Sequence, residues 1–214
     1  MRQRWMVAAL WVLVCDLTVA SELRESPLSG WEEIVFEGRT EYQRDAEMDC
    51  VRARAENSAS GLIREREVDL KQTPVLRWSW RAEEPLAPGR DAPEKEKAGD
   101  DFLARVYVIR EGFFRWQTRA VNYVWSREHP EGSHWPNPYT GNAVMVVVQS
   151  GEEGLGEWRE FERNVREDFK RYHDRDVERI DALAIMTDAD DTEGEAEACY
   201  RLPEFAPLSG RSGE

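Results

Sequence analysis

Short segments in which apolar and polar positions alternate dominate the chain. In residues 75–82, Leu76, Trp78 and Trp80 alternate with arginine and serine, which is the period of a strand with one buried face. Similar segments are rich in β-branched or aromatic residues and are bounded by Gly, Pro, Asn or Asp. We predict strands over 31–36, 47–56, 61–70, 75–82, 101–110, 120–126, 143–150, 180–187 and 196–202, with the first three towards sheet edges.

The segment 101–110 shows the expected division of faces. Phe102, Val106 and Val108 share one face, and Arg105 lies on the other. A strand that buries the first set therefore directs Arg105 away from the main core.

One segment has the helical period instead. Val165, Phe169 and Tyr172 follow an i, i+4, i+7 pattern within residues 164–174, and Asn164 is placed to cap the amino end. About nine strands with one short α-helix predict an all-β chain, folded as a two-layer antiparallel β-sandwich of jelly-roll-like form.

The two ends of the chain differ from this pattern. Arg2 and Arg4 precede an apolar run that is followed by small residues, which is typical of a secretory signal peptide over 1–20. The run is shorter than the ~20 residues that span a membrane. We therefore expect a secreted or periplasmic protein with a single domain over 21–205, a disordered tail over 206–214, and no membrane span after signal cleavage. An uncleaved amino-terminal anchor is the alternative.

The net charge limits the classes of partner to be expected, and the cysteines bear on the cellular compartment. The chain has 43 acidic and 29 basic residues, a net charge of −14, which argues against nucleic acid or anionic lipid as the main partner. Removal of the signal leaves Cys50 and Cys199. In an oxidising compartment a disulfide between them is expected, and two separate buried thiols are the alternative.

An acidic stretch follows the last long apolar run. Asp188 and Asp190 stand at alternate positions, with Thr192 two residues further on. Carboxylate and hydroxyl oxygens at this spacing are candidate ligands for calcium. The alternatives are a turn held by its own side-chain-to-backbone hydrogen bonds, or pairing with arginine.

A second acidic pair, Asp100 and Asp101, precedes a predicted strand. Arg105 and Arg163 are natural partners for these carboxylates, and a structural salt-bridge network is one interpretation. The other is a polar cleft that binds a ligand. Its candidate residues are Asp100, Asp101, Arg105, Asn122, Trp135, Tyr139, Arg163, Asp188 and Asp190.

Two of these candidates are aromatic residues of a loop. Trp135 and Tyr139 lie in the Pro-rich loop 127–142, where a flat ring suits the apolar face of a sugar, unless it folds back onto the sandwich. His129 and His134 lie in the same loop, but their i, i+5 spacing favours hydrogen-bonded or exposed roles over metal ligation.

Five blocks of sequence carry a resemblance to a known family. They are AGDDFLARVYVIR, VNYVWS, WPNPYTGNAVMVVVQSG, ERNVREDFKRY and IDALAIMTDADDTEGEAEACY. In this order they resemble a bacterial family named domain of unknown function 3047, over roughly Gly30 to Phe205. The family's Asp-Thr-Asp-Asn-Thr/Ser stretch appears here with departures at 189 and 191, and both alternate aspartates are kept. The family has no assigned activity, so the resemblance implies none.

Three functions are compatible with these features. The favoured one is a non-catalytic module that binds a polar ligand such as a carbohydrate, by analogy with other sandwiches. The second is a glycan-acting hydrolase or lyase that uses a carboxylate pair such as Asp101 and Asp188. The third is a structural or assembly protein of the cell envelope.

Overall fold

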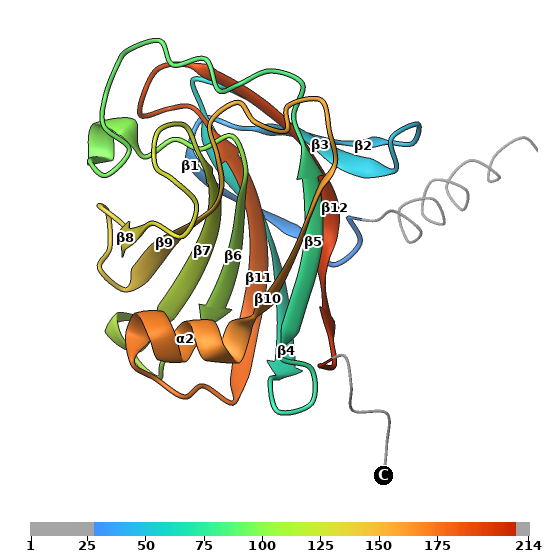
Figure 1. Cartoon of the computed structure of the whole chain (residues 1–214), viewed down its shortest axis with the longest axis vertical. Coiled ribbons are helices and arrows are strands. Elements are labelled where there is room, and N and C mark those ends of the chain that lie inside the picture. The colour runs from blue at the N-terminus through green and yellow to red at the C-terminus, as the bar shows by residue number, and fades with distance from the viewer. Residues whose placement is uncertain (1–27, 209–214) are drawn as a thin grey trace, which may run out of the picture.

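A computed structural model describes residues 28–208 as two packed β-sheets (Figure 1). The seven-stranded sheet has the order β1-β4-β11-β6-β7-β9-β8, and the five-stranded sheet has the order β10-β5-β12-β3-β2. The predicted two-layer β-sandwich is therefore confirmed. The predicted signal peptide lies outside the described residues, as does the tail beyond Leu208.

Twelve strands and one α-helix make up the described part of the chain. The strands are β1 Glu32–Glu37, β2 Glu41–Asp45, β3 Cys50–Glu56, β4 Ala59–Asp69, β5 Val75–Arg81, β6 Arg105–Arg110, β7 Arg119–Ser126, β8 His134–Pro136, β9 Ala143–Ser150, β10 Arg159–Asn164, β11 Arg179–Asp188 and β12 Glu195–Ala206. The helix is α2 Val165–His173. No helix in this range is long and apolar enough to cross a membrane.

The main core fills the space between the two sheets. Trp78, Trp80 and Trp125 are at most 4% exposed, so the alternation predicted for residues 75–82 is confirmed. Trp78 stacks on Tyr123 with ring centroids 5.1 Å apart, which joins β5 of one sheet to β7 of the other. Large aromatic rings thus form the contact between the layers.

The helix α2 lies across one end of the sandwich (Figure 1). Asn164 Oδ1 accepts a hydrogen bond from the Glu167 backbone N–H, so the predicted N-cap is confirmed. Phe169 is fully buried, and Tyr123 donates to the Asp168 carboxylate at 2.7 Å. The apolar stripe of the helix therefore covers part of the core where the smaller sheet ends.

Several strand predictions differ from the structure. The strands β2, β8 and β10 were not predicted, because they are exposed, three residues long, or mostly charged. β3 and β4 are not edge strands: β3 lies between β12 and β2, and β4 lies between β1 and β11. The pair β7–β9 is parallel, the one departure from the antiparallel arrangement predicted for the sheets described. β12 also continues to Ala206, into the segment predicted as a tail.

The strand β6 begins at Arg105 rather than at residue 101. Asp101 leaves the strand because its carboxylate binds the acidic turn after β11. Phe102 does not join Val106 and Val108 in the main core; it packs in a second cluster with Val124, Trp135, Met145 and Val147. Val124 and Met145 alternate along their strands with main-core residues, so this cluster lies on the outer face of the seven-stranded sheet.

A disulfide links two strands of the smaller sheet, and the loop 83–100 is held against the sandwich. Cys50 of β3 and Cys199 of β12 form a disulfide with Cα atoms 5.7 Å apart, within the five-stranded sheet. The predicted loop 83–100 folds back onto the sandwich, because Ala87 pairs with Glu195 and Glu94 is fully buried. The loop 127–142 contributes Trp135 to the second cluster, and Lys95 of the loop 83–100 lies 5.1 Å from the centroid of the Trp135 ring.

Candidate functional site

The predicted polar residues gather first around Arg105, whose side chain is 3% exposed. Arg105 Nε donates to Asp188 Oδ1 at 2.8 Å, and its Nη2 donates to the second oxygen of the same carboxylate. Nη2 also donates to the Asp100 carbonyl, and Nη1 donates to the Tyr107 hydroxyl at 3.1 Å. The guanidinium is thus surrounded by acceptors, and the Arg105–Asp188 pair is a closed, buried salt bridge.

Asp101 holds the acidic turn from the opposite side. Its Oδ2 accepts hydrogen bonds from the backbone N–H and the hydroxyl of Thr192, both at 2.6 Å. Its Oδ1 accepts from the backbone N–H of Asp191 at 3.2 Å. The turn is therefore held by a buried carboxylate from another part of the chain, which is an architectural role.

Two of the predicted calcium ligands already have hydrogen-bond partners within the protein. Asp188 is committed to Arg105, and Thr192 is committed to Asp101. The carboxylate oxygens of Asp101, Asp190 and Asp191 lie within 4.8 Å of one another instead. Since Asp101 is satisfied by the turn and no other group points to an ion, we assign no metal to these three acids.

The crowding of acids around one guanidinium changes their protonation. Burial raises the pKa of Asp100 to about 6, against the pull of Arg105 and Asn137. Burial and the charge of Asp101 raise the pKa of Asp190 to about 6 as well. Burial also raises the pKa of Asp188, although the Arg105 charge opposes it. Between pH 5 and 7, roughly, the cluster therefore changes its charge.

Asn122 lies beside this cluster but is fully buried. It pairs with Tyr107 across β6–β7 and donates to Met145 Sδ at 3.3 Å. Asn137 Nδ2 donates to Asp100 Oδ2 at 2.9 Å. The Oδ1 atoms of Asn122 and Asp100 are buried without a hydrogen-bond partner. Asn122 is thus adjacent to the cluster, beneath the surface rather than in a cleft.

Two other predicted site residues lie elsewhere or are covered. Arg163 pairs with Asp168 of α2, with Nε 2.9 Å from Oδ2, and its guanidinium lies 5.7 Å from the Tyr123 ring. It does not join the Arg105 cluster, because β10 belongs to the other sheet. Trp135 is 7% exposed and packs in the second cluster, so it offers no stacking surface.

Tyr139 remains at the surface, with 54% of its area exposed. Its hydroxyl donates to Asp191 Oδ1, and the Lys97 ammonium lies 5.1 Å from its ring centroid. The predicted polar cleft is therefore largely a closed network, with Tyr139 and the partly buried Asp190 and Asp191 at its rim.

A pocket of about 820 Å³ opens elsewhere, on the five-stranded sheet. Strand register places two rows of polar side chains across it: Glu160, Ser79 and Arg201 in one row, and Glu162, Arg77 and Glu204 in the next. Ser79 is 5% exposed, whereas the carboxylates and guanidiniums are exposed. Trp78, Phe161 and Tyr200 lie below the rows and also line the pocket.

The hollow exists because β3 does not extend along the whole length of β12. β3 pairs with β12 only as far as Tyr200, while β12 continues to Ala206. The last residues of β12 therefore have β5 as their one paired neighbour among the described strands, and the register shifts between Arg201 and Glu204. Arg44, Asp49 and Arg64 line the rest of the pocket.

The charges of this pocket are mostly not neutralised by direct contacts. Arg77 and Glu162 form an ion pair at 2.8 Å. Arg201 lies over the Trp158 ring, 4.1 Å from its centroid. Within residues 28–208, no ion pair or hydrogen bond engages the side chains of Arg44, Arg64, Arg201, Asp49, Glu160 or Glu204. Donors and acceptors thus face open space in similar numbers.

Sequence reasoning missed this pocket for a specific reason. The alternation of Arg77 and Ser79 with buried tryptophans was recognised, but a charged outer face is the ordinary condition of a sandwich strand. No strand is predicted over the residues of β10, because that segment is mostly charged. The hollow itself depends on where β3 begins, which no local pattern reveals.

The family described as "Protein of unknown function (DUF3047)" matches residues 29–202. A search of curated proteins returned no match.

Solved structures with a similar arrangement include a family 11 carbohydrate-binding module from Clostridium thermocellum in complex with a mixed-linked tetrasaccharide. It has a TM-score of 0.44 and 8% identity, over 86% of this chain and 91% of that chain. The xyloglucanase domain of NopAA from Sinorhizobium fredii has a TM-score of 0.46 and 8% identity, over 83% and 92%. Likeness at this level assigns no ligand or activity to the present chain.

Proposed function

This chain belongs to the DUF3047 family of proteins of unknown function, and we propose that it is an exported, non-catalytic module that binds carbohydrate in the pocket of its five-stranded sheet. The observation that carries the proposal is the pair of cross-strand rows in that pocket, where the Arg201 guanidinium and the Glu160 and Glu204 carboxylates make no ion pair within residues 28–208.

The side chains of the rows suit a ligand with many hydroxyl groups. A sugar hydroxyl both donates and accepts, so it needs both kinds of partner nearby. Glu160 and Glu204 supply acceptors, and Arg201 supplies donors. The volume of about 820 Å³ falls within the roughly 300–1,000 Å³ usual for ligand pockets. The mixture of charges also favours a neutral polar ligand over a strongly charged one.

Binding fits the pocket better than hydrolysis. A general acid for glycoside cleavage needs a carboxyl group that a buried environment keeps protonated. Glu160, Glu162 and Glu204 are all exposed to solvent. The pair considered from the sequence, Asp101 and Asp188, is bound to the acidic turn and to Arg105. Neither the three pocket glutamates nor the two buried aspartates are therefore suited to cleave a sugar.

Export is part of the proposal. The disulfide between Cys50 and Cys199 supports an oxidising compartment, since such bonds are rare in the cytosol. The amino-terminal segment and the net charge of −14 are consistent with a soluble protein of the cell envelope or its surroundings.

Affinity electrophoresis and calorimetry with soluble polysaccharides test this function. The panel contains a mixed-linked glucan, a galactan, a xylan and a uronic-acid polymer. We expect at least one neutral polymer to bind, and the variants Arg201→Ala and Glu160→Gln to lose about tenfold in affinity, or ~1.4 kcal/mol each.

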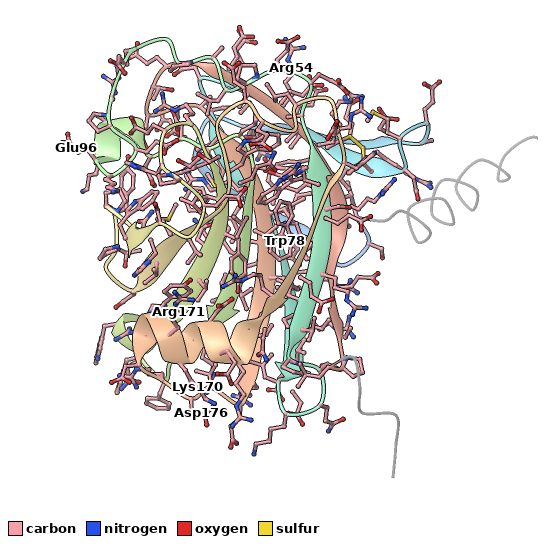
Figure 2. All side chains as sticks on the ribbon, in the orientation of Figure 1. Arg54, Trp78, Glu96, Lys170, Arg171 and Asp176 are labelled. Atoms are coloured by element: carbon pink, nitrogen blue, oxygen red, sulfur yellow. A yellow bond between two sulfur atoms is a disulfide. The ribbon has the colours of Figure 1, made fainter. Side chains whose placement is uncertain are left out.

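Arg54→Ala is the matched control. Arg54 is also exposed, but it lies near one end of the sandwich, away from Trp78 at its middle (Figure 2). This variant should bind like the unchanged protein. If no polymer binds, or if all three variants bind equally, the pocket is not a carbohydrate site.

A further inference from the structure

A second group of possible ligand atoms lies outside both regions described above. Glu94 comes from the loop 83–100, and Glu128 and His129 come from the loop 127–142. One carboxylate oxygen from each glutamate and one ring nitrogen of His129 all lie within 4.8 Å of one another. Unlike the acidic turn, this group combines oxygen and nitrogen donors.

The histidine nitrogen is the observation that points to a ligand. His129 Nε2 is a buried atom without a hydrogen-bond partner. The nearest charged atom, Glu128 Oε1, lies 3.5 Å away, beyond good hydrogen-bonding distance. A buried imidazole nitrogen normally has a partner. A metal ion satisfies the lone pair of a neutral imidazole directly.

The carboxylates supply oxygen ligands for a cation. Glu94 is fully buried, and its carboxylate accepts hydrogen bonds from the Ser126 hydroxyl and the Arg127 backbone N–H. Glu128 Oε1 accepts from the Glu94 backbone N–H at 3.0 Å, which holds the two loops together. Arg127 Nε is 3.6 Å from Glu94 Oε1 and only partly offsets the negative charge.

The spacing fits a small divalent ion. Two ligands about 2.1 Å from a tetrahedral zinc ion are roughly 3.4 Å apart, and Glu128 Oε1 lies 3.5 Å from His129 Nε2. We propose that Glu94, Glu128 and His129 bind a divalent transition-metal ion, with Zn²⁺ as the best match. Three protein ligands leave the fourth position to water.

Such an ion would have a structural consequence. It would join the loop 83–100 to the loop 127–142, both of which contact the second hydrophobic cluster. The ring of His129 meets that of Trp135 edge-on, with centroids 4.9 Å apart. Metal binding at His129 should therefore stabilise both loops and change the emission of Trp135. The proposal does not depend on carbohydrate binding.

The test uses the full chain, stripped with a chelator and titrated with Zn²⁺, Co²⁺ or Ca²⁺. We expect Zn²⁺ at a hundredfold excess over its Kd to raise the Tm by about 5–10 °C. Co²⁺ should give visible absorption bands of an N,O-coordinated site. The variants His129→Gln and Glu128→Gln should lose at least tenfold in Zn²⁺ affinity.

The control is His134→Gln, which changes an exposed histidine in the same loop. It should retain full affinity. Because Co²⁺ absorption is measured on the unchanged protein, the result does not depend on whether a variant folds. Absence of both Zn²⁺ stabilisation and Co²⁺ bands would overturn the proposal, as would Zn²⁺ binding that survives His129→Gln. If His129 pairs only with Glu128, neither Zn²⁺ stabilisation nor Co²⁺ bands will be observed.

Discussion

The two sheets use their charged side chains in opposite ways. On the seven-stranded sheet, Arg105 and Asp188 are each 3% exposed at the side chain and are bonded to one another. On the five-stranded sheet, Arg201 and Glu160 are exposed, and no ion pair engages them within the described residues. Both regions contain arginine and acids, but only the second presents them to a hollow.

This difference separates charged side chains that hold the fold together from charged side chains that are free to contact a ligand. A buried charge must be compensated inside the protein, because its desolvation penalty is several kcal/mol. A charged group that is already compensated has few hydrogen-bonding positions free for a ligand. An exposed charge is solvated and needs no partner, so it can exchange water for the hydroxyl groups of a ligand. Charged residues at strand ends therefore indicate a site only when the structure leaves them unpaired.

The largest expected effect comes from removing the buried guanidinium. Arg105→Met leaves the carboxylates of Asp188 and Asp100 buried without their counter-ion. We expect a loss of about 3–5 kcal/mol in the free energy of unfolding. For a domain of this size that lowers the Tm by roughly 6–20 °C. Calorimetry or urea denaturation measures both quantities.

The double variant Arg105→Met with Asp188→Leu provides the internal check. Because it removes both members of the pair, it should regain part of the lost stability. The exposed Arg54→Met should change stability by less than about 0.5 kcal/mol. A loss below about 1 kcal/mol for Arg105→Met would contradict an architectural role for the cluster.

The sequence predicted much of this cluster but not its organisation. The approach of Arg105, Asp101 and Asp188 followed from acids that flank strands and from an arginine between them. Which acid pairs with which base depends on strand order, and that order puts Arg163 on the other sheet. The same limit applies to Trp135, because the folding of a loop over a sheet has no periodic signal.

The fold was more predictable than the site for a physical reason. Alternation along β5, β9 and β11 reports burial directly, since every second side chain must enter the core. The short strand β8 and the charged strand β10 lack that signal. The pocket depends on β10 and on where β3 begins, so its position could not follow from pattern alone.

An intermediate effect should appear as a pH dependence of stability. The pKa of Asp100 rises from 3.8 in the unfolded chain to about 6 in the fold, mainly through burial. Protonated Asp100 therefore favours folding. Its contribution is complete below about pH 4 and is lost as the pH rises through 6, with an upper limit of ~3 kcal/mol. Asp190 acts in the same direction.

Unfolding measured from pH 4 to 7 tests this contribution. In Asp100→Asn the decline of stability across this range should become shallower by about 1–3 kcal/mol. Asp91→Asn, at an exposed aspartate in the same loop, should leave the profile unchanged. Equal profiles for the unchanged protein and Asp100→Asn would mean that Asp100 stays ionised throughout.

The smallest expected effect on stability comes from a substitution in the pocket. A small effect there would contrast with the large effect expected at Arg105. Glu160 is exposed and makes no ion pair within residues 28–208. Glu160→Gln should therefore change the free energy of unfolding by less than about 0.5 kcal/mol, measured as for Arg105→Met. Since a side chain that binds ligand need not stabilise the fold, the same variant should still reduce polysaccharide affinity. A loss of 2 kcal/mol or more, roughly the size of a buried-charge effect, would mean that the rows of the five-stranded sheet also serve the architecture.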